Sequence, residues 1–94
     1  MLEITNERKE SLIEKLSNEL VALRAKADLS QEEISNILGI SRQSYGAFEL
    51  KKKKMTWRTC FSLIMYFEYN VKTQEMLHAL ELFPEELSDV GEIS

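Results

Sequence analysis

The apolar residues of this chain recur every three or four positions over most of its length, which is the spacing of one face of an α-helix. Four leucines follow this spacing among charged residues and predict one long helix over about residues 6–27. They are Leu12, Leu16, Leu20 and Leu23. No stretch alternates convincingly between polar and apolar residues, as half-buried strands do. The hydrophobic pattern therefore predicts an all-α fold without a sheet.

Short polar signals divide the rest of the chain into further helices. Ser30 with Glu33 three residues later is a capping box, and Gly39 suits the left-handed residue that often follows a helix. Ser41 and Thr56 are residue types that cap helix N-termini. The single proline suits the first turn of a short last helix. The helices predicted after the first span about residues 31–38, 42–50, 57–69, 72–82 and 84–87.

A length of 94 residues is typical of one domain. We expect the main domain over residues 1–70 and a helical extension over residues 71–94, which serves as a dimerisation element rather than a second domain. Residues 91–94 are expected to be a frayed tail. One cysteine, Cys60, excludes an intramolecular disulfide and suits a reducing compartment. No basic leader and no apolar run of about 20 residues is evident, so we expect a cytoplasmic protein with no membrane association.

Residues 31–50 combine two short predicted helices with a tight turn at Gly39, as a helix-turn-helix does. Ile34 and Leu38 form the apolar stripe of the first helix, and Ser35 is small where the two helices would cross. In such a motif the second helix enters the major groove of DNA. The spacing therefore predicts that the helix over residues 42–50 reads DNA.

The second helix of this motif carries groove-reading side chains on its outer face. Tyr45 and Phe48 are three residues apart and form the inner face, so the opposite face is centred on Gln43 and Ala47. Arg42 lies in the first turn. Arginine pairs bidentately with guanine and glutamine with adenine. We therefore expect Arg42 and Gln43 to contact base edges.

The charge of the chain is unevenly distributed, although its net value is −4. Residues 21–58 carry eight positive and four negative side chains, a net charge of +4, whereas residues 59–94 carry one and seven, a net charge of −6. A local basic patch matters more for DNA than the total charge does. Four consecutive lysines follow the second helix of the motif, and either form a solvated loop or, with Arg58, contact phosphates, which we favour at this position. They are Lys51, Lys52, Lys53 and Lys54.

The stretch LSQEEISNILGISRQSYGAFE resembles the Cro/repressor-type helix-turn-helix, also called the XRE family, and KKKKMTWRTCFSLIMYF resembles a bacterial subgroup of it. The resemblance covers about residues 12–69 and implies a lambda-repressor-like bundle of five helices in a sequence-specific transcription regulator. The residues that match in register are Gln31, Ser35, Gly39, Ile40, Ser41 and Glu49. The chain departs from the pattern at Tyr45, where a smaller aliphatic residue is more usual, and at Lys51, where Asn-Gly often ends the recognition helix.

The resemblance also implies roles for individual residues. Arg42, Gln43, Gly46 and Ala47 would face the bases. Phosphate contacts would come from Gln31 and Ser41. Apart from the resemblance, we expect phosphate contacts also from Ser44, from Arg58 and from Lys51, Lys52, Lys53 and Lys54, which we call the lysine loop. Arg24 and Glu49 would form a partly buried ion pair with a structural role.

Some residues have competing interpretations. Gly46 is either a tolerated defect in the helix or a point where the backbone approaches DNA closely. His78 and Cys60 lie on different predicted helices and have no further His or Cys beside them, so we expect no metal, no cofactor and no catalytic site. We expect His78 on the surface beside Glu75 and Glu81, and Cys60 in the core.

A single recognition helix reads few bases, so we expect a homodimer on a palindromic operator in double-stranded DNA. The helices predicted over about residues 57–69 and 72–82, with the residues just after them, carry more apolar side chains than a domain of this size is expected to bury alone, and a dimer would cover them. These side chains include Phe61, Met65, Met76, Leu77, Leu80, Leu82 and Phe83. The alternative function is a protein-interaction module, such as an antitoxin-like partner that binds another protein through its acidic C-terminal part.

Overall fold

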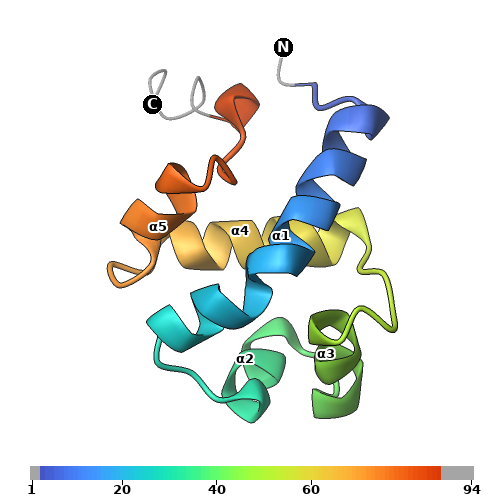
Figure 1. The fold of residues 1–94 in the computed structure, drawn as a ribbon, viewed down its shortest axis with the longest axis vertical. Coiled ribbons are helices and arrows are strands. Elements are labelled where there is room, and N and C mark those ends of the chain that lie inside the picture. The colour runs from blue at the N-terminus through green and yellow to red at the C-terminus, as the bar shows by residue number, and fades with distance from the viewer. Residues whose placement is uncertain (1–2, 88–94) are drawn as a thin grey trace.

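The computed structural model describes residues 3–87, which contain helices and no strand (Figure 1). The helices are α1 (Asn6–Lys26), α2 (Gln31–Leu38), α3 (Arg42–Glu49), α4 (Trp57–Glu68) and α5 (Gln74–Ala79). Residues 85–87 are also helical, so the described chain holds six helical segments rather than five. The prediction of an all-α fold is confirmed, and the sixth segment lies where a short last helix was expected. The predicted tail at residues 91–94 lies outside the described residues.

The helix over residues 72–82 was predicted too long, because α5 covers Gln74–Ala79 only. Thr73 precedes it as a buried residue whose hydroxyl donates to the carbonyl of Phe67, at 2.8 Å. After the helix, Glu81 takes a left-handed backbone conformation with φ 57°. Local hydrogen bonds and backbone conformation therefore end the helix at both sides, so α5 is shorter than the stretch over which its apolar residues recur.

The core lies between α1 and α4, which cross each other, while α2 and α3 form one end of the molecule (Figure 1). The leucines that predicted the first helix are all fully buried. The apolar side chains that α1 and α4 bury are Leu12, Ile13, Leu16, Leu20, Leu23, Cys60, Leu63, Ile64 and Phe67. The motif region therefore sits on a rigid two-helix support.

Among residues 3–87, no helix combines the length and the apolar character that crossing a membrane requires. The longest helix, α1, has 21 residues, but its exposed faces are charged.

The N-terminal cap of α1 is Thr5, whose hydroxyl accepts a hydrogen bond from the backbone N–H of Arg8 at 3.1 Å.

Candidate nucleic-acid interface

α2 begins at the capping box and ends at the glycine that were predicted from the sequence. The Ser30 hydroxyl accepts from the Glu33 N–H at 3.0 Å, and the Glu33 carboxylate accepts from the Ser30 N–H at 2.8 Å. The hydrogen bond that the Ser30 N–H donates to the carboxylate is the largest cause that lowers the pKa of Glu33. At the other end Gly39 has φ 73°, a conformation that residues with a Cβ rarely adopt. Ser35 is buried between the helices, so α2 and α3 pack closely.

α3 begins at Ser41, whose hydroxyl accepts from the Ser44 N–H at 3.0 Å and donates to the Ser44 hydroxyl at the same distance. Tyr45 and Phe48 are buried and fix which face of the helix points inward. Because successive residues turn by about 100°, the opposite face is left to solvent. One face of α3 is therefore packed against the core, and the opposite face is exposed to solvent.

The outer face of α3 carries the four residues assigned to base reading. Arg42 and Gln43 are exposed, and Gly46 and Ala47 are partly exposed. Among residues 3–87, neither Arg42 nor Gln43 has a side-chain hydrogen bond or ion pair. A flexible cationic group and an amide are therefore available to an external ligand at the N-terminal end of α3.

Glu49, at the end of α3, forms an ion pair with Arg24 of α1. The Arg24 Nε donates to Glu49 Oε2 at 2.6 Å and its Nη2 donates to Oε1 at 3.1 Å, which makes the pair bidentate. The Arg24 Nη1 also donates to the Leu29 carbonyl at 3.0 Å. The exposed fraction of the Glu49 side chain is 5% and that of Arg24 is 20%. The pair implied by the resemblance therefore exists as a geometric contact, with the carboxylate more deeply buried than the guanidinium.

Two further donors complete the surroundings of Glu49. The Tyr45 hydroxyl donates to Oε2 at 2.6 Å, and the Gln31 amide donates to Oε1 at 2.8 Å. Burial acts to raise the pKa of Glu49, but the hydrogen bonds from Arg24, Tyr45 and Gln31 together lower it. Burial, followed by the hydrogen bond to Glu49, raises the pKa of Tyr45. The carboxylate thus joins side chains of three helices.

This network was only partly foreseen from the sequence. Gln31 was assigned to phosphate, whereas its amide group already donates to Glu49 and its Oε1 lies 3.7 Å from where a Cβ at Gly46 would be. Tyr45, which departs from the family pattern, could have been found as a partner because it lies four residues before Glu49 on the same helix face. No local signal marks Gln31, which is 18 residues from its partner.

The chain leaves α3 through a left-handed residue, Lys51, with φ 61°. The Lys51 N–H donates to the Phe48 carbonyl at 3.1 Å, and the Lys52 N–H donates to the Ala47 carbonyl at 2.9 Å. These two bonds are the pair that defines a Schellman end, in which glycine usually occupies the left-handed position. A lysine therefore does here what Asn-Gly does in the family pattern.

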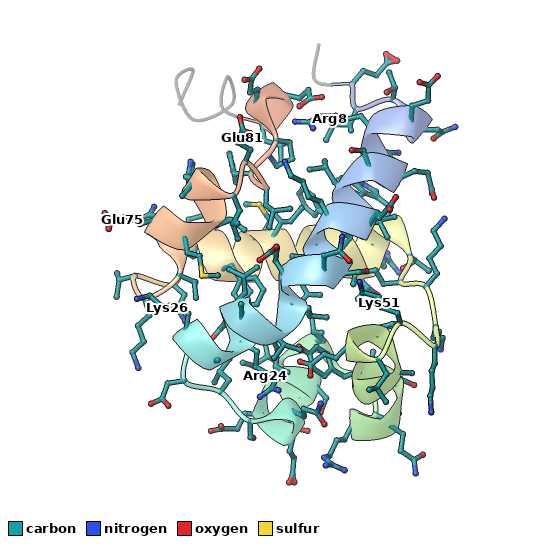
Figure 2. The ribbon with its side chains drawn as sticks, in the orientation of Figure 1. Arg8, Arg24, Lys26, Lys51, Glu75 and Glu81 are labelled. Atoms are coloured by element: carbon teal, nitrogen blue, oxygen red, sulfur yellow. The ribbon has the colours of Figure 1, made fainter. Side chains whose placement is uncertain are left out.

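The four lysines after α3 are exposed, but their ammonium groups are not equivalent. Lys51 donates to the Asn18 side chain and lies between α3 and α1 (Figure 2). Lys54 forms an ion pair with Glu10. Lys53 lies over the Phe48 ring at 5.8 Å from its centroid. Sequence reasoning could not foresee the contacts to α1, which span 33 and 44 residues.

The remaining titratable candidates lie away from α3. The Cys60 thiol is fully buried, and this burial raises its pKa to about 12. His78 is exposed, as expected, and its Nε2 lies 2.6 Å from Glu68 Oε1 on α4. Within residues 3–87, no three His, Cys, Asp or Glu side chains come together as metal ligands would.

The surplus apolar surface is placed differently from the prediction. Leu77 and Leu82 are fully buried in the core and cannot contribute to a dimer. Tyr69 and Val71 have exposed fractions of 81% and 90%. They line a shallow hollow with Met65 along α4 and the turn that follows it, which we call the Tyr69–Val71 patch. The other predicted members, Phe61, Met65, Met76, Leu80 and Phe83, are half-buried.

No family model, no curated protein and no solved structure matches this chain. Its chemistry must therefore be argued from the geometry. The exposed end of α3 offers Arg42 and Gln43, and the adjacent loop offers Lys52 and Lys53. The Arg42, Lys52 and Lys53 side chains only donate hydrogen bonds, and the Gln43 amide both donates and accepts them. This combination suits an anionic ligand with hydrogen-bonding edges.

Proposed function

We propose that this chain is a sequence-specific DNA-binding transcription regulator in which α2 and α3 form a helix-turn-helix of the Cro/repressor type. The observation that carries the proposal is the two-sided character of α3. Tyr45 and Phe48 anchor its inner face in the core, while Arg42 and Gln43 are exposed and unpaired among the described residues. A helix held in this way can enter the major groove without rearrangement.

The proposed division of labour follows the chemistry of each group. Arg42 and Gln43 reach base edges, and the short Gly46 and Ala47 allow close approach or contact with a thymine methyl. Phosphates are bound by Ser41, Ser44 and Arg58 at the edges of the motif, together with the lysine loop. Lys52 is the freest of these four lysines, since within residues 3–87 its side chain makes no hydrogen bond, no ion pair and no contact with an aromatic ring, whereas Lys53 lies over Phe48.

The surroundings of Glu49 support the proposal because they fix the angle of α3. Arg24 and Gln31 attach this residue to α1 and α2 through hydrogen bonds of 2.6 to 3.1 Å. A groove-reading helix must be held to within about half an ångström of its productive position. The network supplies this rigidity without using any residue of the outer face.

The regulator is proposed to act as a homodimer on a palindromic operator. α3 has eight residues and meets few base pairs alone, whereas two copies can read half-sites about 34 Å apart. The Tyr69–Val71 patch is the most exposed apolar surface available for pairing. Residues 80–87, which include three glutamates, lie at the end of the molecule opposite α2 and α3, where they do not repel DNA (Figure 1). Light scattering across a range of concentrations tests the dimer, and a strict monomer on a palindromic duplex contradicts it.

A protein-interaction module is the second candidate, and one observation favours it. Tyr69 and Val71 are the two most exposed large apolar side chains among residues 3–87, they line the same shallow hollow, and they precede the acidic part of the chain. Retention on heparin separates the two candidates. A DNA-binding protein elutes late and loses retention as salt rises, whereas a module that binds only protein elutes early.

Selection of bound duplexes from a random-sequence pool tests the proposed function. We expect enrichment of a palindrome whose half-sites are separated by about one helical turn. Retention of the pool without any enriched sequence contradicts sequence-specific reading. The same selection with Gln43→Ala is a useful control, because it should relax the preference at one position of each half-site.

A further inference from the structure

The lysine loop that follows α3 is bound along α1 rather than projecting freely. Its first lysine, Lys51, donates to Asn18, and its last, Lys54, pairs with Glu10. The loop therefore runs antiparallel to α1, because later lysines meet earlier residues of that helix. The two α1 residues are separated by eight positions, which correspond to about 12 Å of helix.

The groove between the loop and α1 gathers charges of both signs. Glu10 and Glu14 line it from α1, and Lys51, Lys53 and Lys54 line it from the loop. Both members of the Lys54–Glu10 pair are largely exposed, with exposed fractions of 66% and 57%. An exposed pair of this kind is weak and exchanges readily with other ions. An anion that approaches Lys54, such as a DNA phosphate, meets a lysine that already has a carboxylate partner.

We propose that Glu10 competes with DNA phosphates for Lys54, so that α1 acts as an internal substitute for the DNA backbone. This inference rests on the proposed DNA-binding function and specifies how its affinity is set. When DNA binds, Lys54 exchanges the carboxylate for a phosphate, and the Lys54–Glu10 ion pair is lost. The free energy of that ion pair makes DNA binding less favourable by the same amount for every sequence, because phosphates carry no base information.

The competition also changes how binding depends on salt. A lysine that is neutralised by a carboxylate displaces fewer counterions from DNA than a free one. Removing the carboxylate should therefore make the salt dependence steeper, by up to about one ion in the slope. The gain in affinity should be greatest at low salt and fade as salt screens the charges.

The test is a double-mutant cycle on Glu10 and Lys54 in the full chain, read as affinity for a 20-base-pair random duplex at several salt concentrations. Glu10→Gln should tighten binding by about two- to fivefold at low salt, the range expected when an exposed ion pair is lost. Lys54→Gln should weaken binding. Glu10→Gln should then have no effect in the Lys54→Gln background, since the lysine through which it acts is gone.

Glu7→Gln is the matched control, because it removes the same charge from an exposed position one turn earlier on α1. Within residues 3–87 Glu7 has no lysine or arginine partner. Tightening by Glu10→Gln in the wild-type background only, without tightening by Glu7→Gln, supports the proposal. An equal effect in both backgrounds, an equal effect of Glu7→Gln, or no effect at all overturns it. Failure of both the wild type and Glu10→Gln to bind any duplex at low salt would instead overturn the DNA-binding function itself, and this inference with it.

Discussion

At the scale of single residues, Glu49 is the most consequential side chain of the motif. A carboxylate that is 5% exposed would be costly to bury without partners, yet it accepts hydrogen bonds from Arg24, Gln31 and Tyr45. Each donor comes from a different helix. Through these hydrogen bonds Glu49 links α1, α2 and α3.

Removing either partner of the Arg24–Glu49 pair should destabilise the protein. We expect Arg24→Met or Glu49→Leu alone to lower the free energy of unfolding by about 2–4 kcal/mol, somewhat less than for a fully buried pair because Arg24 retains contact with water. The double variant should lose less than the sum, because no unpaired charge remains. Denaturant unfolding of the three variants measures this, and near-zero losses in both single variants would contradict it.

The same carboxylate should make stability depend on acid. The pKa of Glu49 is lower in the folded protein than its ordinary value of 4.5, so the charged form contributes stability above that value. The contribution is lost as the pH falls through the lower, folded pKa. Unfolding free energy measured from pH 6 to pH 3, a window about 1.5 units either side of the ordinary glutamate pKa, should fall more steeply for the wild type than for Glu49→Gln. Parallel curves for the two proteins would show that Glu49 does not titrate in this way.

At the scale of elements, left-handed residues terminate several helices, and most of them are not glycine. Asp28, Lys51 and Glu81 have φ of 62°, 61° and 57°, and only the end of α2 uses Gly39. A side chain in this conformation costs about 1–2 kcal/mol. The end of α3 is therefore strained at Lys51 although its hydrogen bonds are complete.

Replacing Lys51 with glycine should relieve this strain. We expect Lys51→Gly to raise the free energy of unfolding by up to about 1 kcal/mol, since part of the gain is offset by the greater freedom of glycine in the unfolded chain. Lys52→Gly is the matched control, because Lys52 is the next lysine and its φ is not positive. It should be neutral or destabilising. An equal or larger gain from the control would contradict the assignment of strain to Lys51.

Gly46 in the middle of α3 offers a second test at this scale. A Cβ there would meet only Gln31 Oε1 at an ordinary contact distance of 3.7 Å. Gly46→Ala should therefore stabilise the protein by about 1 kcal/mol through helix propensity. Thermal unfolding measures the gain, and a loss of stability would contradict it. Binding then separates the two interpretations of this glycine: close approach of the backbone to DNA requires that the more stable variant bind its operator less tightly.

At the scale of the whole molecule, the sequence was informative where the determinants are local. Helix periodicity and caps predicted α1 to α4 to within about two residues, because these signals lie within one or two turns. The contacts of Glu49 with Gln31 and of Lys54 with Glu10 span 18 and 44 residues and leave no local pattern. Leu77 and Leu82 were misassigned to a free surface for the same reason, since only the packing of the chain buries them.

The overall arrangement separates charge along the molecule. α2 and α3 occupy one end of the molecule, and residues 80–87 occupy the other (Figure 1). The lysine loop leads from α3 back along α1, and residues 80–87 include three glutamates. A net charge of −4 is therefore compatible with attraction of one end to DNA and repulsion of the other. Under the proposed function, this arrangement of charge would orient the protein on DNA, and α3 would set its register.

The central claim is that Arg42 reads a base from the major groove. The direct test compares Arg42→Ala with Lys52→Ala on the selected duplex and on a random duplex, at several salt concentrations. Arg42→Ala should cost about 1–3 kcal/mol on the selected duplex and much less on the random one, whereas Lys52→Ala should weaken both alike and reduce the salt slope by about one. If Arg42→Ala weakens both duplexes equally, α3 does not read bases through Arg42 and the account is wrong at its centre.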